Sequence, residues 1–343
     1  MKSRLTLFLQ VIFSFFILSF CDVYSNGSGN WVNVGAGPNA SVRALSEFNG
    51  DLVAGGTFQT AGGGVIASRI IKWNGAVWSG IGGGVNGDVN SVIKFNNELI
   101  AAGNFSTAGG SVSVNNIAKW NGTVWSSLGS GLNGTVFSMT VFNNELIAAG
   151  SFTLSGSVAV SNIARWNGAE WLPLGNGLNA LTRVVSVHSG KIIAGGNFTS
   201  SGSAALNRIA EWNGAEWLPL GNGFNNAVYS LESDGSELYA GGIFTLSGSD
   251  PVNRIARWNG SGWSPLGSGA DGTVSVIYYY NNLLYAGGNF NNAGGIPASK
   301  AANGTAATGV RLAPVLIIRS KLFTSQTIYF TAAGILLLPV MNL

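Results

Sequence analysis

The sequence predicts an all-β protein in which one four-stranded unit recurs along most of the chain. A Trp-Asn-Gly triplet returns at steps of 46 or 47 residues, and a second tryptophan follows each first one by five residues. Glycine supplies 51 of the 343 residues while charged residues make up only 9%, a balance that favours short strands and tight turns. The tryptophan pairs are Trp73 and Trp78, Trp120 and Trp125, Trp166 and Trp171, Trp212 and Trp217, and Trp258 and Trp263. Since a period of this length counts repeated units, we expect one array over residues 26–300.

The first 25 residues have the pattern of an export signal. Lys2 and Arg4 precede an apolar run over residues 5–20, and a polar boundary follows. Val23 and Ser25 provide the small residues that suit cleavage after Ser25. We therefore expect residues 1–25 to be removed and the protein to be secreted or held at the cell surface.

Cys21 is the only cysteine of the chain. A mature chain that begins at Asn26 contains none, so it forms no internal disulfide. Two alternatives stay open at this end: lipidation of Cys21, which the bulky Phe20 before it disfavours, and an uncleaved anchor.

The formal net charge of +3 comes from 17 basic and 14 acidic residues. Two of the basic residues lie in the segment that we expect to be removed, so little basic excess is left to attract phosphates. We expect no nucleic-acid partner.

Each period divides into four short strands, and the copy over residues 89–129 shows them best. The predicted strands are 89–95, 98–105, 116–120 and 123–128. Asn96-Asn97 separates the first two, and a Gly/Ser-rich loop leads to the third. Asn121-Gly122 separates the last two, and we predict a type I′ turn there because both residues tolerate positive φ. The two tryptophans of each unit then face each other across one hairpin.

Small residues recur at the end of the second strand of every unit, and a phenylalanine follows two residues later. The copies are Ala54-Gly55-Gly56, Ala101-Ala102-Gly103, Ala148-Ala149-Gly150, Ala194-Gly195-Gly196, Ala240-Gly241-Gly242 and Ala286-Gly287-Gly288. Glycine weakens an isolated strand, so its fixed place predicts that another backbone or ring comes close. Sheets that crowd toward a common axis create this need, and the sequence therefore predicts a β-propeller of four-stranded blades. The alternative is a β-solenoid, whose coils usually take about half as many residues.

We predict six blades. Trp31 opens a segment, residues 31–35, that matches the second half of the unit 47 residues before Trp78. This N-terminal strand is expected to be the outer strand of the last blade and so to close the ring. Seven blades, with the C-terminal tail included, is the alternative.

Two stretches carry a family resemblance. Leu284-Tyr285-Ala286-Gly287-Gly288, and Arg257-Trp258-Asn259 followed by Trp263-Ser264-Pro265-Leu266, resemble Kelch-type repeats, in which Gly-Gly closes the second strand and aromatic residues mark the third and fourth. The chain departs from that pattern by a tryptophan in the third strand, a shorter turn after it and the phenylalanine after Gly-Gly. In these respects it is similar to Kelch-like repeats of secreted bacterial proteins and of fungal cortical-marker proteins. The resemblance covers residues 31–300 and implies a propeller fold, but no single function.

The repeat pattern fails after residue 300. Asn303-Gly304 stands where the next triplet is due, but without its tryptophans. We interpret residues 301–343 as a degenerate repeat or a frameshifted apolar tail, and a membrane or sorting tail is the third alternative. Residues 328–343 are 16 in number with Pro339 among them, fewer than the roughly 20 residues of a membrane span. We expect no transmembrane span in the mature chain.

No constellation in the sequence points to catalysis, a cofactor or a metal. His188 is the only histidine and replaces an ordinary strand residue, so we predict no catalytic role for it. Metal sites of N and S ligands need several His or Cys residues. Asp234-Gly235-Ser236-Glu237 resembles part of a calcium loop but lacks the other oxygen ligands, so we expect a turn.

Charged residues also follow the repeat. Acids recur beside the first hairpin turn and cations recur just before the first tryptophan, and we expect both sets to be surface residues. The acids are Asp51, Glu98, Glu145 and Glu237, the cations are Lys72, Lys119, Arg165 and Arg257, and Glu170 and Glu216 repeat within the tryptophan hairpin. The tryptophan rings are predicted to be core, since burying one removes about 150 to 250 Å² from water. Exposed rings that bind sugars are the alternative.

These observations predict a non-catalytic binding module for an extracellular protein or glycan. Four loops vary in sequence on a fixed frame, which suits recognition, and they span residues 107–115, 154–161, 200–206 and 246–253. The alternatives are an exported glycan hydrolase or lyase and a structural spacer of a larger surface protein. An asymmetric polar cluster near the axis is the feature that would favour an enzyme.

Overall fold

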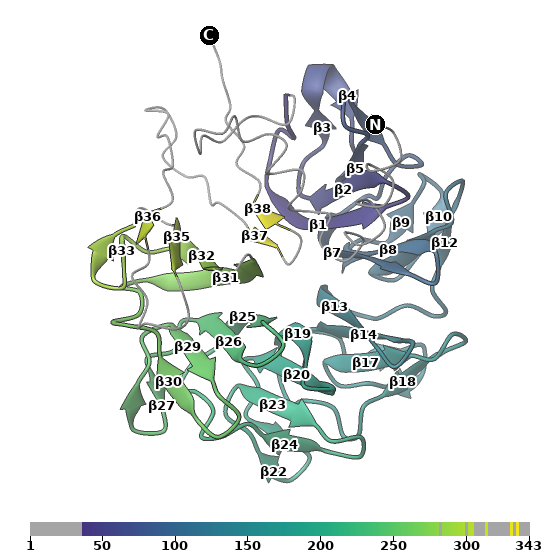
Figure 1. Ribbon diagram of the computed structural model, residues 1–343. Coiled ribbons are helices and arrows are strands. Elements are labelled where there is room, and N and C mark those ends of the chain that lie inside the picture. Colours follow the sequence, from purple (N-terminus) through teal and green to yellow (C-terminus); the bar gives the residue numbers. More distant parts are fainter. Residues whose placement is uncertain are drawn as a thin grey trace, which may run out of the picture.

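The computed structural model describes residues 36–280 and 283–298, and the backbone of four short strands beyond residue 300. In these segments the regular structure is antiparallel β apart from the single 3-10 turn η1 (Gly62–Gly64). Six four-stranded sheets are arranged around a common centre, and the first strand of each is innermost (Figure 1). This is the arrangement of a β-propeller, as the repeat predicts.

The six sheets follow one another along the chain, each with its strands ordered from the centre outward. The first two are β1 (Val42–Phe48), β2 (Asp51–Gly56), β5 (Ile70–Trp73) and β6 (Trp78–Gly80), then β7 (Asp88–Phe95), β8 (Glu98–Asn104), β11 (Ile117–Trp120) and β12 (Trp125–Ser127). The next two are β13 (Val136–Phe142), β14 (Glu145–Gly150), β17 (Ile163–Trp166) and β18 (Trp171–Pro173), then β19 (Thr182–His188), β20 (Lys191–Gly196), β23 (Ile209–Trp212) and β24 (Trp217–Pro219). The last two are β25 (Val228–Ser233), β26 (Leu238–Gly242), β29 (Ile255–Trp258) and β30 (Trp263–Pro265), then β31 (Thr273–Tyr280), β32 (Leu283–Asn289), β35 (Ala301–Gly304) and β36 (Ala313–Pro314).

A two-stranded hairpin connects the second and third strands of every sheet. These hairpins are β3 (Thr60–Ala61) with β4 (Val65–Ile66), β9 (Thr107–Ala108) with β10 (Val112–Ser113), β15 (Leu154–Ser155) with β16 (Val158–Ala159), β21 (Ser200–Ser201) with β22 (Ala204–Ala205), β27 (Leu246–Ser247) with β28 (Asp250–Pro251), and β33 (Asn292–Ala293) with β34 (Ile296–Pro297). The four loops that the sequence singled out are therefore ordered hairpins. β4, β10, β16, β22 and β34 each contact the outermost strand of their own sheet.

The turn type predicted for the tryptophan hairpin is wrong. Trp120 and Trp125 are direct partners, but only Gly122 of the Asn-Gly pair has a positive φ. Asn121 instead accepts the backbone N–H groups of Thr123 and Val124 on its Oδ1, both at 2.9 Å. The four-residue loop thus uses an amide side chain as a cap. Positive φ at two successive positions occurs instead in the first hairpin of the first four sheets, as at Asn96-Asn97 (48° and 61°).

The expected close approach at the small residues is confirmed. A Cβ on Gly196 would lie 2.3 Å from the backbone oxygen of Leu181, where the inner strand of the same sheet begins. A Cβ on Gly195 would instead lie 2.7 Å from the Val228 side chain of the next sheet. The backbone of the same sheet therefore requires glycine at position 196. At position 195, the side chains of the next sheet require a small residue.

The hydrophobic core lies between neighbouring sheets. One cluster joins Ile147 and Ile163 of the third sheet to Val185 and Trp217 of the fourth, and equivalent clusters join the other successive pairs. The first sheet carries a further cluster on its other face, which includes Trp73. The fold is therefore stabilised by stacking of sheets around the centre.

The tryptophan rings belong to this core, as predicted. Eight of the ten described rings are buried, while Trp120 and Trp212 are half-buried. The second ring of a pair also donates its Nε1–H to a backbone oxygen of the preceding sheet. These bonds are Trp125 to Ile81 at 3.1 Å, Trp171 to Leu128 at 3.0 Å, Trp217 to Leu174 at 3.1 Å and Trp263 to Leu220 at 3.0 Å. Each bond links neighbouring sheets.

The sixth sheet takes its outer strands from beyond residue 300. β35 pairs with β32 so that Gly304 opposes Leu284, which is the place of a tryptophan in the other sheets. A last hairpin, β37 (Phe330–Thr331) with β38 (Gly334–Ile335), lies between β31 and β1 (Figure 1). Residues 1–25 and 31–35 lie outside the described part, so the signal segment and ring closure by residues 31–35 stay predictions.

Candidate functional site

The innermost strands share an irregularity that exposes one residue of each. The register shifts after the first buried position, so the next residue is bulged out of the ladder. Bulges re-aim side chains and are common beside functional sites. We name these six half-buried residues the bulge ring: Arg43, Asn90, Phe137, Arg183, Tyr229 and Ser275.

The bulge ring is chemically uneven although its members occupy one repeat position. The residue before it is valine in five copies and threonine in one, whereas the bulge position holds five residue types in six copies. The sequence analysis missed this contrast, and an alignment of the six copies on the buried valine would have found it.

The first half of the bulge ring is tied together by hydrogen bonds. Arg43 donates from Nη1 to Asn90 Oδ1 at 2.8 Å and to Asp88 Oδ2 at 3.0 Å. Asn90 donates in turn from Nδ2 to the backbone oxygen of Val136 at 2.9 Å. Asp88 Oδ1 also lies 4.0 Å from Arg69 Nε, so two guanidinium groups share this carboxylate. The Arg43 side chain links the first and second sheets.

In the second half of the bulge ring, the cation Arg183 lies between two aromatic rings. The guanidinium carbon of Arg183 lies 4.6 Å from the ring centroid of Tyr229 and 6.0 Å from that of Phe137. Its Nε donates to Asn197 Oδ1 at 3.1 Å. Among the described residues, no carboxylate forms an ion pair with Arg183. Cation–π contacts of this kind contribute roughly 0.5 to 2 kcal/mol.

The bulge ring and the hairpins lie at the same end of the sheets. In an antiparallel sheet, the start of the first strand and the connection from the second to the third strand share one end. We call this end the hairpin face and the opposite end, with the tight turns, the turn face. Because the hairpins contact outermost strands, they surround the central bulge ring at the periphery (Figure 1).

A repeated side-chain oxygen, from an amide in five copies and a carboxylate in one, fixes the base of each hairpin. Asn179 accepts the backbone N–H groups of Thr199 and Ser200 on Oδ1, at 2.8 and 3.0 Å, and donates to Thr199 Oγ1 at 3.0 Å. The same position is held by Asn39, Asn86, Asn133, Asn225 and Asp271. These residues hold the hairpins in place, and the sequence analysis did not recognise them.

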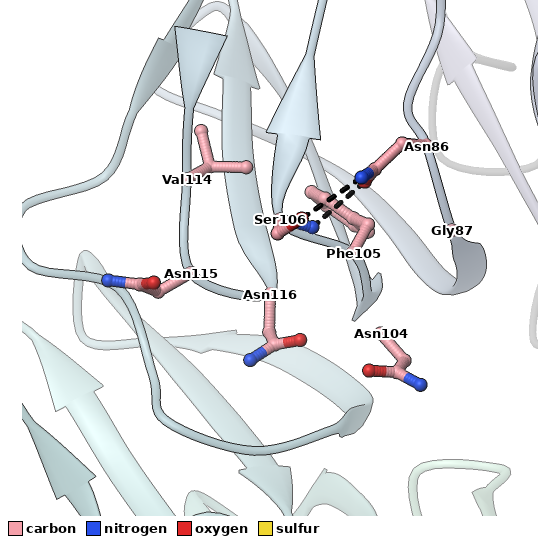
Figure 2. A pocket seen from close by; sticks show the side chains of 8 residues that line it. All are labelled: Asn86, Gly87, Asn104, Phe105, Ser106, Val114, Asn115 and Asn116. Atoms are coloured by element: carbon pink, nitrogen blue, oxygen red, sulfur yellow. Dashed lines mark hydrogen bonds between the residues drawn. The ribbon is translucent and has the colours of Figure 1, made fainter.

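One pocket of the hairpin face lies beside the second sheet (Figure 2). Most of its amides are engaged in the fold: Asn86 bonds Ser106, and Asn116 donates to the Leu132 backbone oxygen at 2.7 Å. Its lining residues are Asn86, Gly87, Asn104, Phe105, Ser106, Val114, Asn115 and Asn116. The pocket therefore offers few free polar groups, and we place the candidate site at the bulge ring.

The repeated charges of the turn face form ion pairs across neighbouring strands. The repeated acids and the repeated cations were both recognised in the sequence, but their pairing was not. The strand register brings each acid next to its cation. The pairs are Asp51 with Lys72 (2.6 Å), Glu98 with Lys119 (3.0 Å), Glu145 with Arg165 (2.6 Å) and Glu237 with Arg257 (3.3 Å), while Lys191 and Glu211 form a reversed pair (2.8 Å). Such partly exposed pairs contribute about 0 to 1 kcal/mol each to folding stability. The charged residues are therefore surface residues, as expected.

His188 ends the inner strand of the fourth sheet and is buried. Its Nδ1 lies 2.8 Å from Ser233 Oγ, and its Nε2 lies 3.3 Å from Ser189 Oγ. Burial lowers the pKa of its imidazole, while the charges of Asp234 and Glu211 oppose that shift. Both ring nitrogens thus contact serine hydroxyls. Within the described part of the chain, no carboxylate is hydrogen-bonded to the ring as in a catalytic triad.

The predicted turn at residues 234–237 is present. Asp234 accepts the backbone N–H groups of Ser236 and Glu237 on Oδ1, at 2.9 and 2.7 Å. Its Oδ2 accepts the hydroxyl of the buried Tyr239 at 2.8 Å, and that hydroxyl also lies 2.9 Å from Glu237 Oε2. Although burial raises the pKa of Asp234, these hydrogen bonds outweigh it and leave the pKa below its ordinary value. The carboxylate is therefore occupied by its own turn.

Glu232 is an acid in an unusual setting. It lies near the end of β25, and its Oε1 accepts the backbone N–H of Tyr279 in β31 at 3.4 Å. Burial raises the pKa of its carboxyl from 4.5 to about 8, although the hydrogen bond from Tyr279 acts in the opposite direction. The side chain is thus protonated at neutral pH, between the fifth and sixth sheets.

We expect stability to fall as the pH rises. The folded chain holds the Glu232 proton up to about pH 8, whereas the unfolded chain releases it near pH 4.5. The contribution of Glu232 to stability is therefore full below pH 4.5 and declines as the pH approaches 8. Because Glu232 is only half-buried, solvent screening reduces the effect of the shift, and the unfolding free energy should drop by about 1 to 3 kcal/mol across this window, as urea titrations at several pH values would measure. Glu232→Gln should remove the decline and the exposed control Glu170→Gln should not. An equal slope in all three chains would contradict the assignment.

Two structural properties hold for the described residues only. Within residues 36–280 and 283–298, no group of three or more His, Cys, Asp or Glu side chains is placed to hold a metal ion. No helix in the same part of the chain is long and apolar enough to cross a membrane.

Comparison with known proteins shows the fold and no family. No family model matches the chain, and no curated protein matches it in sequence. A computationally designed protein, Ika8, is similar in structure, with a TM-score of 0.51 and 12% identity over 80% of this chain and 74% of that one. An ancestral GH74 enzyme gives a TM-score of 0.52 and 12% identity over 82% of this chain, which spans only 39% of that enzyme. At such identity the likeness concerns the fold alone.

Proposed function

We propose that the chain is a secreted or cell-surface β-propeller that serves as a non-catalytic binding module for a glycan or an extracellular protein. The observation that carries this proposal is the bulge ring, where one repeat position holds five residue types in six copies. A purely structural position would vary little, as the buried position before it does, with valine in five copies and threonine in one. Variation on a rigid frame is the arrangement that recognition uses.

The proposal includes the finer architecture. We infer Kelch-like repeats from the sequence resemblance, and six blades with residues 31–35 closing the ring. The position of β37 between β31 and β1 favours the alternative of a seventh, degenerate blade. Either number leaves the six described sheets and the bulge ring in place.

The purified mature chain should bind a ligand without changing it. We expect retention of at least one class on a glycan array or an extracellular protein panel, and no products in parallel polysaccharide-cleavage assays. Binding without turnover supports the module. Turnover that is lost on changing His188 or a single acid would show an enzyme instead of a binding module. If the chain shows neither a ligand nor turnover, the result would favour a spacer in a larger surface protein.

A glycan hydrolase or lyase is the second candidate, and Glu232 is the observation that favours it. A carboxyl that is protonated at neutral pH is suited to general acid catalysis. Glycoside hydrolysis also needs a second carboxylate roughly 5 to 10 Å away. The fold likeness to a GH74 enzyme is compatible with this candidate. Cleavage by the native chain and none by Glu232→Gln would establish it.

A further inference from the structure

We propose that the bulge ring binds a carboxylate-bearing saccharide, with Arg183 as the residue that holds the carboxylate. The inference rests on the proposed binding function and names its ligand class. It follows from the charge state of the described arginines, the side chains around Arg183 and the polar groups next to them.

Arg183 is the cation of the bulge ring that has no carboxylate partner among the described residues. Arg43 also belongs to the ring, but it forms an ion pair with Asp88 at 3.0 Å. The guanidinium of Arg183 is fixed on one side by Nε, which donates to Asn197. Its two terminal nitrogens have no hydrogen-bond partner among the described residues. A guanidinium presents these donors as a planar fork that fits a carboxylate through two parallel bonds.

Aromatic rings hold this fork in position. Tyr229 and Phe137 come from the two neighbouring sheets, and both are half-buried. Their contacts reduce the rotamer freedom that a free arginine would lose on binding, and pre-organisation of this kind raises affinity. The exposed parts of the rings supply apolar surface for the C–H groups of a sugar, and the Tyr229 hydroxyl supplies a polar end.

The surroundings favour a saccharide over an acidic peptide. Recognition of acidic motifs in peptides uses clusters of arginines, whereas the bulge ring holds one unpaired cation. The polar group that contacts Arg183 is the neutral amide of Asn197, which is not a member of the ring, and the remaining member Ser275 carries a neutral hydroxyl. Amides and hydroxyls both donate and accept hydrogen bonds, so they match sugar hydroxyls.

The test compares charged and neutral forms of the same sugars by isothermal titration calorimetry. The probes are oligosaccharides of galacturonate, glucuronate and mannuronate, each as the free acid and as its methyl ester. We expect at least one free acid to bind the mature chain about tenfold or more tightly than its ester, and added salt to weaken that difference. Esters that bind as well as the acids overturn the inference without any variant.

Variants then locate the site. Arg183→Ala should weaken binding of the free acid about tenfold, and Arg183→Lys should lose nearly as much because it keeps the charge and removes the fork. The matched control Arg165→Ala removes the same charge from the turn face, where Arg165 pairs with Glu145. Its Kd should stay within about twofold. Melting curves test whether each variant is folded. If Arg183→Ala is not folded, the binding of Arg183→Lys decides the outcome.

The outcomes separate this inference from the proposed function. Uronate binding that is unchanged in Arg183→Ala and Arg183→Lys overturns the assignment of the site and leaves a binding module. A different ligand on the array, with no uronate bound, overturns the ligand class alone. Arg183-dependent binding of an oligoglutamate peptide in place of uronates makes the partner an acidic peptide. No ligand of any class removes both proposals.

Discussion

Trp217→Ala is expected to lower the unfolding free energy by about 3 to 5 kcal/mol. The Trp217 side chain is only 1% exposed and packs between the third and fourth sheets. Its Nε1–H donates to the Leu174 backbone oxygen at 3.1 Å. Truncation would therefore leave a cavity at the contact between sheets and an acceptor without its partner.

Urea unfolding measures this loss, and the other ring of the same hairpin is the control. Trp212 is half-buried, so Trp212→Ala should cost clearly less, although both substitutions remove the same side chain. Trp217→Phe should fall between native and alanine, since it keeps most of the apolar surface and loses the hydrogen bond. Equal costs for Trp212 and Trp217 would contradict the assignment of Trp217 to the contact between sheets.

Gly196→Ala should destabilise the chain by about 2 to 4 kcal/mol. The added methyl group would lie 2.3 Å from the Leu181 backbone oxygen and 2.9 Å from the Thr182 Cα. Both atoms belong to the chain just before and at the start of β19, beside the bulge that places Arg183. Relief of the clash would require the backbone to move, so the substitution should also weaken any ligand that the bulge ring binds.

Gly195→Ala is the matched control for this prediction. The nearest neighbours of its Cβ would be the side chains of Val228 and Val184, with no backbone atom among them, and alanine already stands at this position in the second and third sheets as Ala102 and Ala149. We expect a loss of about 1 kcal/mol or less. Thermal melts of the two variants give the comparison, and a greater loss at Gly195 than at Gly196 would show that the backbone clash is relieved at little cost.

The local elements were predictable because their signals are local. The predicted strands at 89–95, 98–105, 116–120 and 123–128 match β7, β8, β11 and β12 to within a few residues. The Trp-Asn-Gly triplet indicated a hairpin with paired tryptophans, and the register confirms the pairing. Its turn type was predicted wrongly. Asn-Gly favours positive φ at both residues, but Asn121 instead caps a longer loop by accepting two backbone N–H groups on its side chain.

The candidate site was not predictable from the sequence in the same way. Arg183, Phe137 and Tyr229 are 46 residues apart in succession, and no local pattern relates them. They meet because three sheets place their first strands side by side at the centre (Figure 1). The sequence analysis placed recognition on the loops between the second and third strands, since their variation was visible without knowledge of the register.

The sequence by itself determined the repeat, the four strands of each unit, the crowding at the second-strand glycines and the burial of the tryptophans. These properties follow from periodicity and from the steric limits of single residues, both of which a linear pattern carries. Only the tertiary structure decided which acid pairs with which cation, that Arg43 pairs with Asp88 while Arg183 has no carboxylate partner among the described residues, and that Glu232 lies half-buried between two sheets. The physical reason is that charge and burial depend on groups that packing brings within a few ångströms across neighbouring strands and sheets, at separations of about 20 or 46 residues along the chain.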